Sequence, residues 1–444
     1  MHRNPDNVST KRRRIAELAR QSPQRGFTSL AYLMDIDWLR EAWRLTRKDG
    51  AAGVDGQTAR DYERDLEGNL LSLLDRAKSG TYRAPPVRRV HIPKGGSMTE
   101  TRPIGIPTLE DKVLQRAVAM LLEPIYEQDF HDCSHGFRPG RGAHQALEAL
   151  WKRTMLNRGG WIVEVDIRKF FDTLDHRHLR EFVGRRVRDG VLLRLIGKWL
   201  SAGVMEEGSV SYPDSGSPQG GVISPMLSNI YLHYVLDEWF EREVKPHLKG
   251  RAHLIRYADD FVIGFTDEQD ARRVMRVMPK RFGRYGLSLH PEKTRLVPFR
   301  QPSARAGGDR GGPPGSFDFL GFTHIWALSQ KGNWVVKQRT AASRLRRAVR
   351  SIAQWCRSNR HLPIAEQQRI LSQKVRGHFA YYGITGNATA LSRFRTAVEC
   401  CWRRWLTRRN RERGATWDAF NRMLERYPLP AVRVVHSIYL RAKA

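Results

Sequence analysis

Apolar residues recur at helical spacing in several long segments of the chain. This spacing predicts helices over residues 31–47, 109–130, 191–200, 230–243 and 271–285. In the sequence WIVEVDI, residues 161–167, apolar and polar positions alternate as they do in a strand. The apolar runs HLIRY and DFVIGF meet at Ala258–Asp259 and predict a β-hairpin. Short strands and turns are expected over residues 82–107, so the whole pattern indicates an α+β fold.

The two ends of the chain differ from its centre. Residues 1–28 are polar and basic, and we expect a loosely ordered N-terminal arm. Residues 301–316 are rich in glycine and proline and predict a loop. Residues 341–444 contain 22 Lys and Arg against 5 Asp and Glu, which predicts a module of basic helices.

The balance of charge points to a polyanionic partner. The chain has 77 Lys and Arg against 46 Asp and Glu, a formal net charge of +31, which favours nucleic acid. A membrane partner is not expected, because there is no lipidation motif, signal peptide or apolar run of about 18 residues. The four cysteines lack CxxC spacing, which argues against a zinc knuckle or a disulfide framework and fits a reducing cytoplasm.

Two adjacent carboxylates, Asp259 and Asp260, stand inside the otherwise apolar run RYADDFVIGF. Burying unpaired carboxylates is costly, so a cation is expected beside them. Asp166 ends the strand predicted over 161–167, and the three carboxylates converge if the strands are neighbours in one sheet. Such a group can hold two divalent ions that support an in-line displacement. Taken singly, each aspartate could equally be an ordinary strand-end or turn residue.

The aspartates belong to a series of motifs that follow one another along the chain. The series is KDGAAGVDG (48–56), PVRRVHIPK (86–94), RPIGIPTLEDKVLQRAV (102–118), SHGFRPGRGAHQAL (134–147), VDIRKFFD (165–172), SPQGGVISPMLSNIYL (217–232), YADD (257–260), GLSLHPEKT (286–294) and FLGF (319–322). It resembles the reverse transcriptases encoded by bacterial group II introns, and covers roughly residues 30–325. The basic tail with HFAYYGITG (378–386) resembles their maturase module, which also serves as the polymerase thumb.

The resemblance implies a right-hand polymerase of fingers, palm and thumb, with an antiparallel palm sheet and a basic helical thumb. Its parts would be a basic arm over 1–28, fingers over 29–150, a palm over 151–325, a thumb and maturase domain over 335–425, and a short segment over 426–444. Asp166, Asp259 and Asp260 would be catalytic and hold two Mg²⁺ ions, or Mn²⁺ in their place. The backbone carbonyl of Ile167 would complete one coordination sphere.

Other positions would contact the substrates. The incoming dNTP would meet Lys94, Arg102, Phe171 and Gln219. Primer and template would meet Tyr257, Phe319, Leu320 and Gly321. Intron RNA would meet Arg403, Arg404, Arg408 and Arg409. Strand alternation would place either Phe171 or Phe170 on the side of Asp166, and Phe171 is expected to exclude a ribose 2′-OH while Phe170 is a core residue. Stacking on RNA bases is conceivable for Tyr381, Tyr382, Trp402 and Trp405, although a core role is favoured for each.

The implied function is RNA-directed DNA polymerisation for a group II intron. The partners would be intron RNA as template, a DNA primer or target DNA, and dNTPs, and the protein would also assist splicing and retrohoming. We find no paired cysteines or His/Asn constellation of an HNH endonuclease before Ala444, and second-strand cleavage is not expected. Two alternatives stay open: a domesticated or defence-associated reverse transcriptase, and an RNA-binding splicing cofactor without required polymerase activity. A homodimer is compatible with the sequence.

Overall fold

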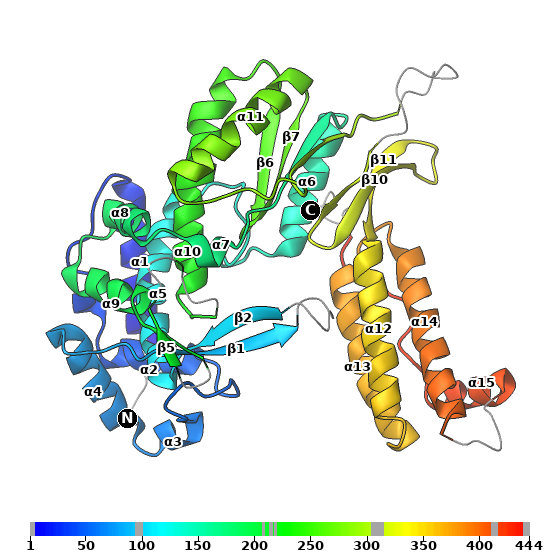
Figure 1. The fold of residues 1–444 in the computed structure, drawn as a ribbon, viewed down its shortest axis with the longest axis horizontal. Coiled ribbons are helices and arrows are strands. Elements are labelled where there is room, and N and C mark those ends of the chain that lie inside the picture. Colours follow the sequence, from blue (N-terminus) through cyan, green and yellow to red (C-terminus); the bar gives the residue numbers. More distant parts are fainter. Residues whose placement is uncertain are drawn as a thin grey trace. The chain divides into compact units, whose positions relative to one another are not determined.

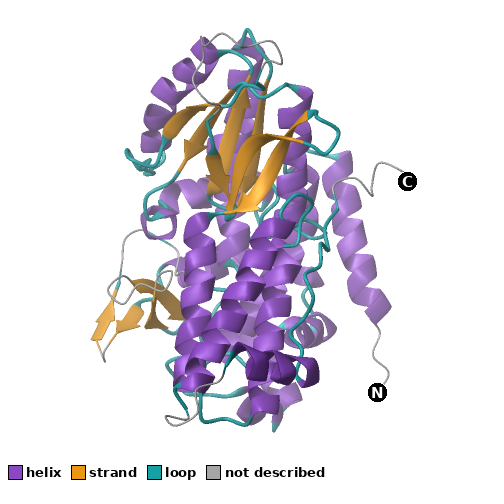
Figure 2. Cartoon of the chain, turned by 90° about the vertical axis from the view of Figure 1, so that its right-hand side faces the viewer, coloured by secondary structure: helices purple, strands orange, loops and turns teal. Residues whose placement is uncertain are grey.

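The computed structural model describes residues 5–93, 101–206, 209–212, 216, 220–302, 315–409 and 416–437. The chain forms two compact units, which are described separately. The first comprises residues 1–146, 165–263 and 269–295, and the second comprises residues 147–164, 264–268 and 296–444. Both units contain helices and strands, as the α+β prediction required (Figures 1 and 2).

In the first unit, helices pack around the long helix α5 (Leu109–Asp129). The Thr108 side chain caps α5 by accepting a hydrogen bond from Asp111 N. Helix α2 (Ile36–Leu45) is fixed to α5 by Trp38 Nε1, which donates to Ala117 O at 2.9 Å. The prediction of a loosely ordered arm is wrong for residues 5–21, which form helix α1 (Pro5–Gln21) against α5. Its buried residues Val8, Ile15 and Ala19 are too widely spaced among lysines and arginines to mark a helix in the sequence.

The remaining helices of the first unit are mostly short. They are η1 (Ala31–Leu33), α3 (Ala59–Glu63), α4 (Leu66–Ser79), α7 (Phe170–Thr173), α8 (His176–Arg186), α9 (Gly190–Leu200), α10 (Ser224–Leu232) and α11 (Glu268–Arg284). The helix predicted over 230–243 is helical but not uniformly α. Helix α10 is followed by two π-helical segments, η2 (His233–Asp237) and η3 (Trp239–Val244), and by the 3₁₀ turn η4 (Lys245–His247).

One sheet of the first unit has the strand order β2-β1-β4-β5. Its strands are β1 (Val87–Pro93), β2 (Thr101–Ile106), β4 (Val204–Glu206) and β5 (Ser209–Ser211). Strands β1 and β2 are antiparallel, with Ile92 opposite Arg102. This register places Arg102 at the end of the pair where β1 ends and β2 begins.

A second sheet has the order β6-β7-β3-β8. Its strands are β3 (Trp161–Val165), β6 (Ala252–Tyr257), β7 (Asp260–Phe265) and β8 (Arg295–Pro298). The predicted hairpin is confirmed, with Ala258 and Asp259 as the turn between β6 and β7. Helix α11 lies along β6 and β7 (Figure 1), where Phe282 stacks on Phe261 with 6.0 Å between ring centroids. The strand over 161–165 is also confirmed, but it is buried on both faces, and even Glu164 is only 8% exposed.

The second unit combines a small antiparallel sheet with basic helices. The sheet has the order β11-β10-β9, formed by β9 (Phe317–Phe319), β10 (Phe322–Leu328) and β11 (Trp334–Thr340). The helices are α12 (Ala342–Ser358), α13 (Ile364–Tyr382), α14 (Ala388–Thr407), α15 (Trp417–Arg426) and most of α6 (Ala143–Leu156). Helices α12, α13 and α14 run side by side (Figure 1) around a core that includes Leu371, Phe394 and Trp402.

Helix α6 joins this unit through β11. Trp151 Nε1 donates to Val336 O at 2.8 Å, and Gln338 Nε2 donates to Leu147 O at 3.0 Å. The second unit is therefore assembled from segments far apart in the sequence. Among the helices described in either unit, none is long and apolar enough to cross a membrane.

Candidate active site

The three aspartates singled out in the sequence lie on neighbouring strands. Asp166 directly follows β3, Asp259 is in the β6–β7 turn, and Asp260 is the first residue of β7, the strand next to β3. Burial raises the pKa of Asp259, and the nearby charge of Asp166 raises it further. The cations of Arg102 and Arg256 act in the opposite direction on the pKa of Asp259. The structure thus brings Asp166, Asp259 and Arg102 within electrostatic reach of one another.

A cationic side chain already faces this carboxylate group. Lys293 Nζ donates to Asp166 Oδ2 at 2.7 Å. Residues 288–290 lie alongside 166–168, because His290 N donates to Asp166 O at 2.7 Å and Ile167 forms an antiparallel bridge with Leu289. Lys293 had no role in the sequence analysis, although its motif GLSLHPEKT was part of the series. Its ammonium is therefore the cationic partner of Asp166 in this structure.

These residues fit a divalent ion of the Mg²⁺ class. Carboxylates are hard oxygen donors, which Mg²⁺ and Mn²⁺ prefer. A half-buried carboxylate with a raised pKa next to a second carboxylate is an arrangement that a bound cation relieves. Asp166, Asp259 and Asp260 could hold such ions.

The turn that carries Asp259 rests on the buried guanidinium of Arg256, which the sequence analysis missed. Arg256 is on β6 and its side chain is fully buried. Its Nε and Nη2 donate to the two carboxylate oxygens of Asp237 at 2.8 and 2.5 Å. Its Nη1 donates to Ala258 O at 3.0 Å, within the turn itself. Further donations reach Asn229 Oδ1 at 2.9 Å and Ser134 Oγ at 2.8 Å.

The motif SHGFRPG packs against the same turn. Arg256 N donates to Cys133 O at 2.8 Å and His135 N donates to Arg256 O at 2.9 Å, so residues 133–135 run along β6. A Cβ on Gly136 would lie 2.3 Å from Ala258 N, a distance that only glycine permits. Ala258 itself has a left-handed φ of 57°. The turn is therefore held in a strained conformation by contacts on its buried side.

Two aromatic rings flank the turn on its exposed side. Tyr257 is half-buried at the end of β6, and its ring centroid is 6.4 Å from that of Phe137. Phe137 is 55% exposed and has a left-handed φ of 56°. An exposed aromatic ring in a strained conformation is a candidate stacking surface. The GFRPGR motif contained this signal, but the sequence analysis assigned no role to Phe137.

The predicted dNTP contacts are only partly described. Arg102 is exposed on β2. Lys94 and Gln219 lie outside the described residues. Gly220 approaches β2 so closely that a Cβ there would be 2.4 Å from Gly105 O. Glycine at this position therefore permits a backbone approach to β2 that a larger residue would prevent.

Phe170 and Phe171 do not alternate along a strand, so the prediction that strand alternation separates them is wrong. Both residues belong to the short helix α7, which begins after Lys169 at a left-handed φ of 44°. Phe170 is buried, as expected, whereas Phe171 is half-buried, and the two rings meet edge to face at 5.3 Å. A Cβ on Gly216 would lie 2.9 Å from Phe171 O, so the chain next to the SPQGG motif approaches α7 as well.

The FLGF motif forms the turn between β9 and β10 in the second unit. Phe319 is buried, and Leu320 and Gly321 have left-handed φ values of 50° and 79°. Tyr381 Oη donates to Leu320 O at 2.9 Å, and the ring of Tyr382 lies 5.2 Å from that of Phe322. The two tyrosines thus support this turn, in agreement with the core role that was favoured for them.

The predicted RNA-contacting arginines differ in their surroundings. Arg404, Arg408 and Arg409 are exposed, whereas Arg403 is half-buried with its guanidinium 4.2 Å from the ring centroid of Trp417. Arg408 lies over Trp405 at 4.9 Å. Trp402 is fully buried and donates to Gln367 Oε1 at 2.9 Å, so it is a core residue. Of these residues, Arg404, Arg408 and Arg409 are therefore accessible at the surface, and Trp402 is not.

Comparison with known proteins decides the family. The reverse transcriptase (RNA-dependent DNA polymerase) family matches residues 92–324, more than half of the chain. The chain belongs to the reverse transcriptase family. The matched region contains Asp166, Asp259 and Asp260.

Its relatives include proteins of group II introns. The chain is 38% identical over 258 residues to protein YkfC of Escherichia coli K12, covering 56% of this chain and 66% of YkfC. It is 39% identical over 223 residues to the group II intron-encoded protein LtrA of Lactococcus lactis, covering 50% of this chain and 36% of LtrA. It is 28% identical over 180 residues to the mitochondrial nuclear intron maturase 4 of Arabidopsis thaliana. The chain thus spans about a third of LtrA and just under two thirds of YkfC, and the resemblance to intron-encoded reverse transcriptases is confirmed.

Proposed function

We propose that the chain is an RNA-directed DNA polymerase of a group II intron, which extends a primer 3′-OH on intron RNA with dNTPs. The observation that supports this most directly is the half-buried carboxylate of Asp259 beside Asp166 and Arg102. Two Mg²⁺ ions held by Asp166, Asp259 and Asp260 would activate the 3′-oxygen and stabilise the leaving pyrophosphate. The backbone carbonyl of Ile167 and, as an alternative ion, Mn²⁺ belong to the same proposal.

The surrounding residues have distinct tasks in this proposal. Arg102 binds phosphate oxygens of the incoming nucleotide and, with Lys94, stabilises the charge on the leaving group. Phe171 excludes a ribose 2′-OH by steric contact, next to Gln219. Tyr257 and Phe137 provide a stacking surface for the primer end. Phe319, Leu320 and Gly321 grip the primer backbone.

The second unit would bind RNA as a thumb and maturase module. Template and primer form a mostly A-form hybrid, which proteins recognise through its backbone and 2′-OH groups. The exposed guanidinium groups of Arg404, Arg408 and Arg409 suit contacts to phosphates. In this proposal the module also holds folded intron RNA and so assists splicing and retrohoming. The arm, fingers, palm and thumb ranges given above remain part of the proposal.

A splicing cofactor without polymerase activity is the competing function. Such a protein has no use for the half-buried carboxylate of Asp259 next to that of Asp166, because the two like charges repel each other unless cations offset them. The site around Asp259 therefore favours the polymerase.

The test is primer extension by the full chain on an RNA template with dNTPs and Mg²⁺. Asp259→Ala should abolish extension while RNA affinity stays within about twofold, since a single carboxylate contributes little to phosphate binding. Asp75→Ala is the matched control, because Asp75 is an exposed aspartate on α4. Extension by Asp259→Ala, or loss of RNA binding together with activity, would contradict the proposed role.

A further inference from the structure

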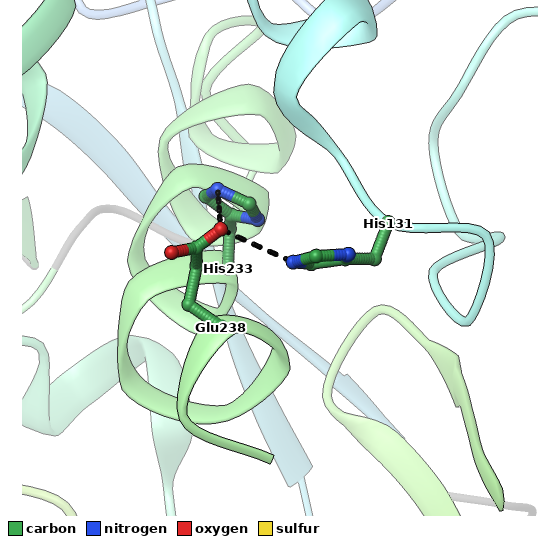
Figure 3. A group of neighbouring side chains, drawn as sticks. All are labelled: His131, His233 and Glu238. Carbon is green, nitrogen blue, oxygen red and sulfur yellow. Dashed lines mark hydrogen bonds and ion pairs between the residues drawn. The ribbon is translucent and has the colours of Figure 1, made fainter. Parts of the chain in front are cut away.

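A group of three metal-ligating side chains lies apart from the aspartates, in the first unit. It consists of His131, which follows α5, and of His233 and Glu238, at either end of the π-helical turn η2 (Figure 3). His131 Nε2 donates to Glu238 Oε1 at 3.1 Å, and His233 Nε2 is 3.8 Å from the same oxygen. The three ligand atoms all lie within 4.8 Å of one another.

The π-helical turn is what places His233 and Glu238 together. Glu238 N donates to His233 O, which is the i→i+5 bond of a π-helix and sets the two residues one above the other. In an α-helix, facing positions are three and four residues apart, so residues five apart would diverge. Single π-helical turns are frequent at functional sites. The π-helical backbone therefore places a histidine and a carboxylate on one face of the helix.

The spacing of the ligand atoms is close to that of a metal site. Zinc binds histidine nitrogens and carboxylate oxygens at about 2.0–2.2 Å in tetrahedral geometry, which puts neighbouring ligand atoms about 3.4 Å apart. The separations of 3.1 and 3.8 Å between Glu238 Oε1 and the two histidine nitrogens lie on either side of this value, and all three ligand atoms lie within 4.8 Å of one another. Two imidazoles and one carboxylate suit zinc and other first-row divalent ions, with water as a fourth ligand.

The surroundings of His233 provide an independent indication. The residue is 2% exposed, yet its Nδ1 has no hydrogen-bond partner and its Nε2 is too far from Glu238 for a hydrogen bond. Burying a polar ring that is not fully hydrogen-bonded is costly. A cation bound at Nε2, the nitrogen nearest Glu238, would give this atom a partner, whereas the unpartnered Nδ1 is not the nitrogen that faces Glu238 and is not part of the site. The second carboxylate oxygen of Glu238 pairs with the exposed Arg242 at 3.1 Å, which leaves Oε1 for the two histidines.

We propose that His131, His233 and Glu238 bind one divalent transition-metal ion of the zinc class as a structural site. His131 stands just before residues 133–136, which support the β6–β7 turn. Glu238 follows Asp237, the partner of Arg256 behind the same turn. The ion would therefore join the two segments that position Asp259. The proposal goes beyond polymerase activity, and metal binding can be measured whether or not that activity exists.

The experiment uses the full chain, freed of metal by a chelator and then titrated with Zn²⁺ in excess Mg²⁺. Mg²⁺ occupies carboxylate sites but competes poorly for imidazole nitrogens. We expect one saturable Zn²⁺ site per chain, and visible absorption typical of tetrahedral coordination when Co²⁺ replaces Zn²⁺. Glu238→Gln and His131→Gln should each weaken binding at least about tenfold.

His247→Gln is the matched control, because His247 is an exposed histidine in η4 of the same helical stretch. It should bind Zn²⁺ like the unaltered chain. Circular dichroism without metal identifies folded variants, and Glu238→Gln preserves the shape of the side chain and an acceptor for His131. The proposal is overturned if the unaltered chain shows no saturable site, or if folded Glu238→Gln and His131→Gln bind Zn²⁺ as tightly as His247→Gln.

Discussion

Arg256 and Asp237 form a doubly hydrogen-bonded ion pair, completely buried behind the turn that carries Asp259. A guanidinium has five N–H donors, and here each has an acceptor: two on Asp237 and one each on Ala258, Asn229 and Ser134. The pair fixes the turn from inside the protein. Its geometry therefore sets the position of the Asp259 carboxylate.

Breaking this pair should be strongly destabilising. Arg256→Met leaves Asp237 buried without a cation, and we expect a loss of about 3–5 kcal/mol in the free energy of unfolding, measured by urea denaturation. Lys245→Met removes the exposed pair with Glu241 and should cost about 0.5 kcal/mol or less. The double variant Arg256→Met/Asp237→Leu should regain stability but not primer extension. Full extension by the double variant would show that the pair does not position the turn.

Asp259→Asn should stabilise the metal-free protein. Folding raises the pKa of Asp259, so the charged form is the less stable one in the folded state. The contribution of Asp259 to the free energy of unfolding is therefore fully present below the pKa that it has in the unfolded chain. It is lost as the pH rises through the pKa that it has in the folded protein. In EDTA at pH 8, the variant should melt at least about 1 °C above the unaltered protein, because each kcal/mol shifts melting by about 2–4 °C. At pH 4 this advantage should shrink.

Mg²⁺ provides the control for this variant. It should raise the melting temperature of the unaltered protein more than that of Asp259→Asn, because the variant has lost a ligand. Asp75→Asn, at an exposed site, should match the unaltered protein throughout. Equal Mg²⁺ stabilisation of all three proteins would remove Asp259 from the metal site.

Phe171 and its neighbour Phe170 should have separable effects. Phe171→Val removes the half-exposed ring, which in our proposal excludes a ribose 2′-OH by steric contact. We therefore expect the ratio of ribonucleotide to deoxynucleotide incorporation to rise at least about tenfold. Phe170→Ala empties a buried site and should cost about 3–5 kcal/mol of stability with unchanged sugar selectivity. Competition assays with both nucleotides measure the ratio. An unaltered ratio in Phe171→Val would exclude this ring from the sugar site.

Gly136 should be intolerant of even one methyl group. In Gly136→Ala the new Cβ would approach Ala258 N to 2.3 Å, so the β6–β7 turn must move. We expect primer extension to fall at least about tenfold, since a shift of about 1 Å in reacting groups can cost a factor of 100. Gly184→Ala, in helix α8 with no atom within 4 Å of the new Cβ, should be active and up to about 1 kcal/mol more stable. Normal activity of Gly136→Ala would mean that the turn tolerates displacement.

His378 should make the protein sensitive to acid. Burial between Phe394 and Tyr382 lowers the pKa of His378 from 6.5 to about 4. The ring is neutral in the folded state, so its stability contribution is intact above pH 6.5 and is lost as the pH falls toward 4. When the pH is lowered from 8 to 5, the free energy of unfolding should fall in both proteins. The fall should be about 2 kcal/mol smaller in His378→Phe than in the unaltered protein. Parallel pH profiles for the two proteins would contradict this assignment.

Secondary structure was predictable where one periodic signal dominated. Helix α5, strand β3 and the β6–β7 hairpin all follow from apolar spacing. Helix α1 was missed because its three buried residues are separated by charged ones, and the π-helical turns after α10 leave no periodic mark. The helix at Phe170 depends on the backbone of Lys169, which periodicity cannot reveal.

The candidate site was predictable only in part. Adjacent aspartates in an apolar run are chemically conspicuous, so Asp259 and Asp260 could be recognised. The partnership of Arg256 with Asp237 could not, because the two residues are 19 positions apart and only tertiary structure reveals that both are buried. Arg256 is one of 77 basic residues in the chain, so nothing in the sequence distinguishes it from the others. Phe137 was overlooked for a similar reason, since exposure and φ are properties of the fold.

The attachment of α6 to β11 affects how the protein can be made. Trp151 and its acceptor Val336 are 185 positions apart, so at about 5–20 residues per second the ribosome delivers the strand roughly 10–40 s after the helix. During that interval the apolar side of α6 has no β11 to pack against. A fragment beginning at residue 335 would lack the helix entirely and should be insoluble or unstable unless residues 147–164 are supplied in trans. The rate of translation and the choice of fragment boundaries therefore affect the production of folded protein, as the amino-acid composition does.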